Sequence, residues 1–321
     1  MNILFCSVGR RVELLKEFRN SLDSNDKIIA VDLSNLAPAL YVADTHYIVP
    51  RIDDPKYLES IIDICKKERV NAITTLIDPE IELLSKNRTI FENLGIEVLA
   101  PYVETAKLCF DKYEMYKFLK AHGISTIDTW DSYETAIEEI DKGLLSFPVF
   151  VKPRKGSGSV GARKVEDIET LKKLCDADPT LIIQRLMDGI DLDADVYIDT
   201  ISHKAVSAFS KRKLETKIGG ASKTISFKDE KLFEFIKHIV DVFKFNGPID
   251  MDFFYKDNEY YLSEINPRFG GAYLHAYGVG IDFIKLIKNN VSGKENIPIF
   301  GNYEDNIIMM MYDSVIITKL I

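Results

Sequence analysis

The residues best suited to chemistry gather between Ile249 and Gly271. Apolar and polar residues alternate there on both sides of a polar turn at 257–259, which predicts a β-hairpin with one face on a core. A turn of three residues would place Asp252 opposite Glu264, and Asn266 would share the face of Glu264 because side chains alternate along a strand. Two carboxylates and one amide oxygen are hard ligands of the kind that Mg²⁺ or Mn²⁺ takes.

Arg268 lies just past the end of this hairpin, where its planar guanidinium could reach phosphate groups held by the same cation. Each of these residues, taken alone, is equally compatible with an acidic and solvated hairpin. Taken together, the four favour a site for a metal ion and phosphate.

A glycine-rich segment at 155–161 is a second candidate. The following residues, 162–165, predict a strand where a dinucleotide-binding turn needs a helix, and the Lys-Ser or Lys-Thr pair of a P-loop is missing. The chain also lacks the His-Arg-Asp and Asp-Phe-Gly sequences of protein kinases. A glycine-rich hairpin can still fold over a triphosphate, although an ordinary Gly/Ser turn has the same composition. The residues concerned are Gly156, Ser157, Gly158, Ser159 and Gly161.

Lys152 is a cation inside the otherwise apolar strand expected at 147–152. Because a buried ammonium needs an anion, a nucleotide phosphate is the expected partner. The strand expected at 180–184 runs into a turn at 188–189, where exposed main-chain groups suit the edge of an adenine. Asp191 follows this turn and is placed for ribose hydroxyls.

Strands and helices alternate in the first third of the chain, which predicts a parallel sheet covered by helices on both faces. Residues 1–102 therefore predict a small Rossmann-like domain, with strands at 3–7, 27–32, 45–49, 72–76 and 97–100.

The remaining chain predicts three further parts. Residues 103–123 predict a linking helix that ends at Gly123, and residues 124–187 predict a compact unit of strands and helices. Residues 188–321 predict a second, antiparallel sheet that includes the hairpin, and 307–321 could be an edge strand or a partner contact. The expected fold class is α/β, with an α+β carboxyl-terminal part.

Two loops of the first domain stay open to interpretation. The turn after the first strand has one glycine, Gly9, where dinucleotide binding needs three, so Asp32 is no evidence for a nicotinamide site. Gly9 could free backbone N–H groups for an anion such as a substrate carboxylate, and a plain turn fits equally well. Residues 77–80 follow a strand at the edge where open sheets bind ligands, with the same two interpretations.

These residues, in their order and spacing, resemble the ATP-grasp superfamily over nearly the whole chain. The likeness points to the branch that contains the carbamoyl-phosphate synthase large subunit and stand-alone carboxylate–amine ligases. It implies that 124–187 is a lid subdomain and 188–321 a carboxyl-terminal subdomain with Mg²⁺ at Asp252, Glu264 and Asn266, while Arg268 stabilises the transferred phosphoryl group. It implies ATP-binding roles for Lys112, Lys152, Gly156, Ser157, Gly158, Ser159, Gly161, Gln184, Arg185, Met187 and Asp191.

Two departures from the family pattern affect this transfer of roles. Gln184 and Arg185 stand where the family usually has acids, and Asp191 replaces a glutamate, so we expect longer or water-bridged ribose contacts. Carbamoyl-phosphate synthase also uses two fused ATP-grasp halves, and one half of this size cannot run that sequence of steps alone.

The resemblance implies an ATP-dependent ligase that activates a carboxylate as an acylphosphate and joins it to an amine. We expect Lys213 and Lys217, in a basic cluster, to act over the γ-phosphate or the substrate carboxylate, although a solvated strand edge is the simpler interpretation of either lysine alone. His275 and Tyr273 could line an acceptor pocket, although a structural role fits them as well. One alternative is a subunit like carbamoyl-phosphate synthase that phosphorylates a carboxylate or carbamate with a partner chain. Another is a nucleotide-binding regulatory protein without turnover.

The composition limits the partners. The net charge of −9 argues against a general nucleic-acid binder. The four cysteines are widely spaced and suggest neither a zinc site nor disulfides. The start is unlike a signal peptide and no stretch suits a membrane span, so we expect a cytoplasmic protein that binds small molecules and could form a homodimer.

Overall fold

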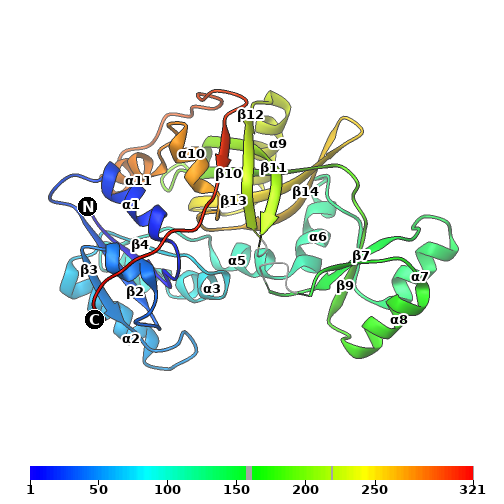
Figure 1. Ribbon diagram of the computed structural model, residues 1–321, viewed down its shortest axis with the longest axis horizontal. Helices are drawn as coiled ribbons and strands as arrows, with labels where there is room; N and C mark the ends of the chain where they lie inside the picture. Colours follow the sequence, from blue (N-terminus) through cyan, green and yellow to red (C-terminus); the bar gives the residue numbers. More distant parts are fainter. Residues whose placement is uncertain (157–160, 218–219, 321) are drawn as a thin grey trace.

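The computed structural model describes residues 1–156, 161–217 and 220–320. Ser157, Gly158 and Ser159, which the sequence places in a phosphate loop, lie outside the described residues. Within the described residues the strands form three separate sheets, one each in the amino-terminal, middle and carboxyl-terminal parts of the chain (Figure 1).

The first sheet is parallel, in the order β3-β2-β1-β4-β5, as expected for a Rossmann-like domain. Alternate residues of β1 pack in two different hydrophobic cores. Ile3 and Phe5 pack in the core that includes α1, whereas Leu4 and Cys6 pack in the core that includes α2, so helices cover both faces of the sheet. The elements are β1 (Asn2–Cys6), α1 (Val12–Ser21), β2 (Lys27–Asp32), η1 (Pro38–Val42), β3 (Thr45–Ile48), α2 (Tyr57–Glu68), β4 (Ala72–Thr75), α3 (Asp78–Lys86), α4 (Arg88–Glu92) and β5 (Glu97–Val98).

The linker is two helices, α5 (Val103–Phe110) and α6 (Lys112–Ala121), so the single helix expected at 103–123 is wrong. Asp111 separates them with extended backbone and caps α6 by accepting hydrogen bonds from the N–H groups of Tyr113 and Glu114. The break places Lys112 at the first position of α6, and its backbone N–H bonds the carbonyl of Arg154.

The middle sheet has the antiparallel order β6-β9-β7-β8. Its core is formed by Val149, Val151 and Ile183 with residues of two helices on one side. The elements are β6 (Thr129–Trp130), α7 (Tyr133–Asp141), β7 (Val149–Pro153), β8 (Arg163–Val165), α8 (Ile168–Ala177) and β9 (Leu181–Arg185).

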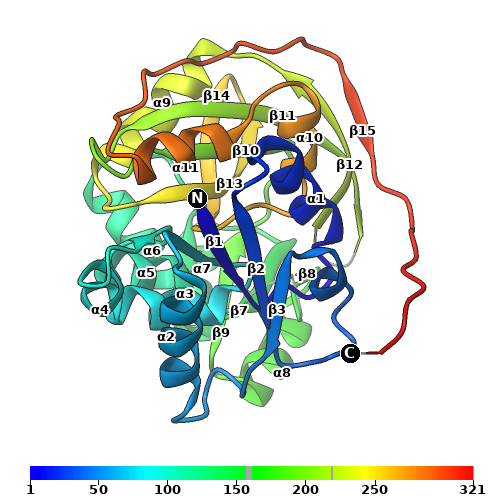
Figure 2. The ribbon, with the colours of Figure 1, turned by 90° about the vertical axis from the view of Figure 1, so that its left-hand side faces the viewer.

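The carboxyl-terminal sheet has the antiparallel order β14-β13-β10-β11-β12-β15. Its elements are β10 (Ile190–Ile198), β11 (Ala205–Lys217), β12 (Gly220–Phe227), α9 (Glu230–Asp241), β13 (Gly247–Lys256), β14 (Glu259–Asn266), α10 (Tyr273–Gly278), α11 (Phe283–Val291) and β15 (Ile308–Met310). The edge strand expected within 307–321 is therefore present at β15, and Figure 2 shows the following residues running along the outside of the molecule.

The hairpin differs from its expected form in one detail. Its turn has two residues, Asp257 and Asn258, both with positive φ, so the expected three-residue turn is wrong. A bulge at Ser263 then adds one residue to β14, and Asp252 pairs with Glu264 after all. Without the bulge, Asp252 would face Ser263, so the bulge is what brings the two carboxylates together.

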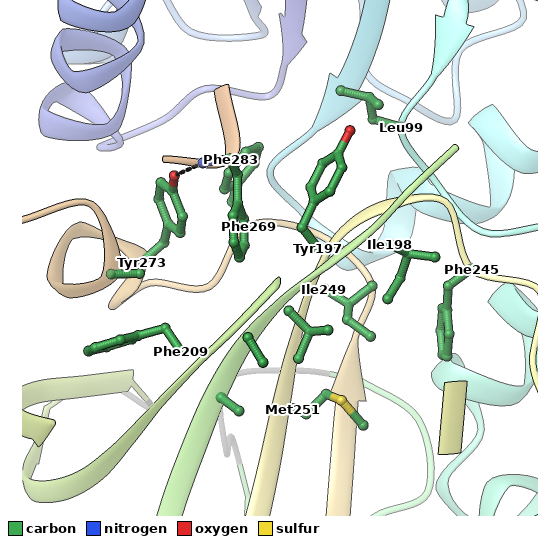
Figure 3. Packing of buried hydrophobic residues seen from close by; sticks show 14 of the residues in the cluster. Leu99, Tyr197, Ile198, Phe209, Phe245, Ile249, Met251, Phe269, Tyr273 and Phe283 are labelled. Atoms are coloured by element: carbon green, nitrogen blue, oxygen red, sulfur yellow. Dashed lines mark hydrogen bonds between the residues drawn. The ribbon is translucent and has the colours of Figure 1, made fainter. Parts of the chain in front are cut away.

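The two faces of this sheet have different chemistry. One face of β10 and β13 packs apolar residues such as Ala194 and Met251 against α9. The other carries alternating charges near the hairpin, while Tyr197 packs beside Phe283, with Phe269 and Tyr273 close by (Figure 3). No helix in the described part of the chain is long and apolar enough to cross a membrane.

Lys211 on β11 is the central cation of the charged face. Its side chain is fully buried, and its ammonium lies 2.9 Å from Asp193 Oδ1 and 2.5 Å from Asp195 Oδ2. Because an unpaired buried carboxylate is costly, we expect Lys211→Ala to lower the free energy of unfolding by about 3–5 kcal/mol in urea titrations. Lys204→Ala, which breaks an exposed ion pair with Asp241, should cost less than about 1 kcal/mol. Equal losses would contradict this account of the charged face.

Candidate functional site

A cavity of about 530 Å³ opens between the middle sheet and the charged face of the carboxyl-terminal sheet. This size lies within the usual range of small-molecule sites. The structure brings most of the expected site residues to its wall. The wall contains Lys112, Ile127, Phe150, Lys152, Pro153, Lys155, Gly156, Ala162, Gln184, Arg185, Leu186, Met187, Asp191, Lys213, Asp252, Phe254, Ser263 and Glu264.

Asp252 and Glu264 face the cavity from paired positions on β13 and β14. The ammonium of Lys213 lies 2.5 Å from Asp252 Oδ1 and 3.0 Å from Asp191 Oδ1. Burial alone lowers the pKa of Lys213, but Asp252, Asp193 and Asp191 raise it above its ordinary value. Lys213 is therefore a charged ammonium that neutralises part of the acidic group.

Asn266 lies beside these carboxylates at the end of β14. Its Nδ2 donates to Asp250 Oδ2 at 3.3 Å and to Asp252 Oδ2 at 3.4 Å. The opposite assignment of the amide would place its oxygen against two carboxylates, so the amide nitrogen is the atom that faces them. Asp252, Glu264 and Asn266 thus offer carboxylate and amide oxygens on one sheet face, a donor set that fits Mg²⁺.

Two further lysines approach the acids from the other side of the cavity. Lys152 on β7 is only 8% exposed, and burial lowers its pKa although Glu264 and Asp252 oppose that shift. Lys112 Nζ lies 3.7 Å from Glu264 Oε1 and donates to the carbonyl of Gly156 at 2.6 Å. The burial of Lys152 that the sequence predicted is confirmed, and its near anions are the protein's own carboxylates.

The cavity wall also has apolar residues, among them Ile127, Phe150, Met187 and Phe254. The side chains of Gln184 and Arg185, both expected to bind ATP, form hydrogen bonds with residues of the middle part of the chain. Gln184 Nε2 donates to Thr129 Oγ1 at 2.8 Å, and Arg185 donates to Asp128 at 3.3 Å and to the carbonyl of Leu144 at 2.7 Å.

Four of the expected site residues that the structure describes lie outside the cavity wall: Asn266, discussed above, and Arg268, Lys217 and Gly161. Arg268 donates to Asp78 at 2.8 and 3.4 Å, which ties the hairpin end to the edge of the first sheet. Lys217 is 71% exposed and lies 3.5 Å from Glu215. Gly161 has a φ of +78° and lies near Pro153. The catalytic role expected for Lys217 gains nothing from this position and stays a prediction.

The structure next decides two open interpretations. The N–H of Gly9 donates to Asp32 Oδ2 at 2.8 Å, so this donor is already used and the plain turn describes it better than an anion site. The expectation that His275 and Tyr273 line an acceptor pocket is wrong, because they are 2% and 0% exposed and pack inside the protein.

Comparison with known proteins agrees with this architecture. The PylC-like, N-terminal domain family matches residues 3–99, and the ATP-grasp domain family matches residues 109–272, just over half of the chain. The chain belongs to the ATP-grasp family. The cavity lies within the part of the chain that this family match covers.

Two relatives show the spread of the family. The chain is 24% identical over 308 residues to a D-alanine–D-alanine ligase of a Nitratiruptor species. The aligned region covers 89% of this chain and 88% of the relative. It is 24% identical over 261 residues to the carbamoyl phosphate synthase large chain of Thermoplasma acidophilum, covering 74% of this chain and only 24% of the relative.

Solved structures share the ATP-grasp fold. The biotin carboxylase domain of Hydrogenobacter thermophilus 2-oxoglutarate carboxylase, solved with MgADP, ADP and bicarbonate, has a TM-score of 0.74 at 17% identity and covers 96% of this chain and 73% of that one. N5-carboxyaminoimidazole synthetase of Staphylococcus aureus, complexed with ADP, has a TM-score of 0.73 at 17% identity, covering 93% and 79%. Such low identities show the fold alone, and they confirm the expected fold class.

Three residues that support the site were not predicted from the sequence: Arg11 in the first domain, and Asp250 and Lys211 in the ATP-grasp domain. Arg11 donates to the carbonyls of Phe269 and Gly270 at 3.2 and 2.6 Å, and Asp250 accepts a hydrogen bond from Asn266. Lys211 lies two residues before Lys213 in a basic stretch of the sequence, but the structure buries its side chain. A usable clue was present, because Asp250 and Lys211 share the strand faces of Asp252 and Lys213 at a spacing of two.

His275 gives a test that depends on pH. Burial, together with the charge of Lys211, lowers the pKa of His275 to about 4. Between pH 6.5 and 4 the unfolded chain takes up a proton at this histidine and the folded chain does not, so stability is lost as the pH falls. We expect His275→Asn to reduce the drop in unfolding free energy between pH 7 and 5 by about 2 kcal/mol. Parallel pH profiles of the two proteins would contradict the prediction.

Proposed function

We propose that the protein is an ATP- and Mg²⁺-dependent ligase that joins a carboxylate to an amine and forms ADP and phosphate. The observation that carries this proposal is the pairing of Asp252 with Glu264 in a cavity that also contains Lys112, Lys152 and Lys213. A site with both a hard-cation donor set and several lysines suits a polyphosphate with its bound metal.

The cavity wall combines charged and apolar residues, which suit the two parts of a nucleotide. Asp252, Glu264 and Asn266 would hold Mg²⁺, and the lysines would hold the triphosphate. The apolar residues, with Phe150 and Phe254 among them, would hold the adenine, and the backbone of 185–187 would meet its edge. Asp191 would bind the ribose hydroxyls. Its Oδ1 lies 3.0 Å from the ammonium of Lys213, so Lys213 would have to move away first.

When bound, ATP supplies the γ-phosphoryl group that turns a carboxylate into an acylphosphate, and Mg²⁺ neutralises charge. The chain's own residues bind and orient. Lys112 and Lys152 offset phosphate charge, Lys112 from α6 of the linking segment and Lys152 from β7 of the expected lid. Gly156, with a φ of +109°, begins the loop expected to cover the phosphates and exclude water.

Arg268 and Lys213 are proposed to serve the reacting groups. Lys213 already lies at the metal-side carboxylates, so it would turn toward the γ-phosphate or the substrate carboxylate when a cation replaces it at Asp252. Arg268 is positioned by Asp78, and its NH1 is 3.8 Å from Asp250 Oδ2, on the same hairpin end as Asn266. From there it would stabilise the phosphoryl group during transfer.

The substrates are proposed to be small molecules, one with a carboxylate and one with an amine. The relatives named as D-alanine–D-alanine ligases support this class. A biotin carboxylase domain described as a dimer supports a homodimer as the assembly. The proposed division into residues 1–102, 103–123, 124–187 and 188–321 assigns the cavity to the last three parts.

Oxygen transfer tests the reaction directly. The carboxylate oxygen forms a bond to the γ-phosphorus as ADP leaves, and the amine then forms a bond to the acyl carbon as phosphate leaves with that oxygen. With an ¹⁸O-labelled carboxylate found by a phosphate-release screen of acids against amines, the released phosphate should contain one ¹⁸O per turnover by mass spectrometry.

The other outcomes of this screen are informative. ADP formed with bicarbonate or a carboxylate in the absence of any amine would favour the phosphorylating subunit. Nucleotide binding without turnover across the whole panel would favour the regulatory protein. Unlabelled phosphate from a productive pair would exclude the acylphosphate route.

A variant of the hairpin tests the metal site. We expect Glu264→Gln to lower kcat/KM by at least about 100-fold, since even partners that only support a metal ligand cost 10–100-fold when removed. Glu259→Gln is the matched control, because Glu259 begins the same strand but is exposed and pairs with Lys231 at 3.0 Å. It should change kcat/KM by less than about twofold. Similar activities in the two variants would remove Glu264 from the site.

A further inference from the structure

Asp250 is a buried carboxyl that links two residues of the proposed site. It lies on β13, two residues before Asp252, and is 8% exposed. Its Oδ2 accepts a hydrogen bond from Asn266 Nδ2 at 3.3 Å and lies 3.8 Å from Arg268 NH1. One oxygen therefore contacts both a proposed metal ligand and the proposed phosphoryl-binding arginine.

The contact with Asn266 determines which atom of the amide can meet a cation. Asn266 Nδ2 is shared between Asp250 and Asp252, at 3.3 and 3.4 Å. If Mg²⁺ takes an oxygen of Asp252, the carboxylate that still holds the amide nitrogen is Asp250. Without it the amide could rotate and present its nitrogen, which is no ligand for a cation.

The other oxygen of Asp250 is held by close packing. A Cβ built on Gly270 would lie 2.6 Å from Asp250 Oδ1 and 2.8 Å from Asp195 Oδ1. Neither of these buried oxygens has a hydrogen-bond partner among the described residues. The backbone at Gly270 therefore lies close to the carboxylate of Asp250, and only a residue without a side chain leaves that carboxylate its present position.

The loop that contains Gly270 is itself fixed from the first domain. Arg11 donates to the carbonyl of Gly270 at 2.6 Å and to that of Phe269 at 3.2 Å. Phe269 also packs on Phe18 of α1 with ring centroids 5.4 Å apart. A continuous set of contacts therefore runs from the first domain through Gly270 and Asp250 to Asn266.

Asp250 also belongs to a group of three buried carboxylates with Asp193 and Asp195, whose ligand atoms lie within 4.8 Å of one another. This group is not a second metal site in our interpretation. The ammonium of Lys211 already contacts Asp193 and Asp195 at 2.9 and 2.5 Å. Gly270 also lies close to the remaining oxygens, since a Cβ added there would meet both Asp250 Oδ1 and Asp195 Oδ1.

We propose that Asp250 is a positioning residue: it keeps the amide oxygen of Asn266 directed at the metal and Arg268 directed at the phosphoryl group, and Gly270 holds Asp250 in place. This inference rests on the proposed function, because it assigns a role toward the same metal site. If the proposal is correct, displacing the carboxylate of Asp250 should weaken metal binding in the same way as removing it.

The test is Mn²⁺ affinity in the presence of ADP, measured by electron paramagnetic resonance on the folded full chain. Asp250→Ala should weaken Mn²⁺ binding about 10–100-fold, the usual effect of losing a partner that supports a metal ligand. Asp250→Asn should stay within about threefold of the wild type, because its amide oxygen can still accept from Asn266 Nδ2. ADP affinity in EDTA should be unchanged in both variants.

Gly270→Ala provides a second variant that leaves every polar group in place. It should weaken Mn²⁺ binding about 10-fold or more by displacing the carboxylate. Gly278→Ala, where an added Cβ meets nothing within 4 Å, is its control. Asp199→Asn is the control for loss of a buried acid, because Asp199 follows β10 and is hydrogen-bonded by Asn290 away from the site. Both controls should bind Mn²⁺ like the wild type.

Wild-type Mn²⁺ affinity in folded Asp250→Ala or in Gly270→Ala would overturn the proposal, as would an equal loss in the Asp199→Asn control. If Asp250→Ala does not fold, Gly270→Ala and its control decide the question. If the wild-type protein neither binds Mn²⁺ in the presence of ADP nor turns over ATP, the proposed function is refuted instead. The two failures are therefore distinguishable.

Discussion

The structure depends on the placement of two carboxylates, Asp252 and Glu264, directly opposite each other on a partly buried sheet face. Like charges in paired positions repel, and partial burial strengthens that repulsion. Such a pair persists only where cations surround it. Lys213 contacts Asp252 at 2.5 Å, and Lys112 lies 3.7 Å from Glu264, so the protein supplies part of the compensation itself. A divalent ion would supply the rest.

This constraint explains why residues far apart in the sequence meet at one cavity. Three lysines of the cavity wall come from three different elements: Lys112 from α6, Lys152 from β7 and Lys213 from β11. The first domain contributes through Asp78, which pairs with Arg268, and through Arg11, which fixes the loop after the hairpin. The parts of the chain thus share one electrostatic centre, and the geometry of that centre depends on how they pack.

The sequence predicted the parts of this arrangement that follow from local pattern. Period-two alternation gave the hairpin and the pairing of Asp252 with Glu264, but the turn was wrong by one residue and only the bulge at Ser263 restored the register. A bulge leaves little trace in a sequence because it adds only one residue to one strand. Contacts that link distant segments, such as Arg11 with Gly270, could not be predicted, since no local pattern specifies which elements will pack together.

The most direct measurement of the central claim is a crystal structure with ADP and Mn²⁺, recorded at a wavelength where manganese scatters anomalously. We expect an anomalous peak about 2.0–2.3 Å from carboxylate oxygens of both Asp252 and Glu264, with Lys213 displaced from Asp252. A peak at the Asp193, Asp195 and Asp250 group, or no peak while Lys213 keeps its contact with Asp252, would contradict the claim.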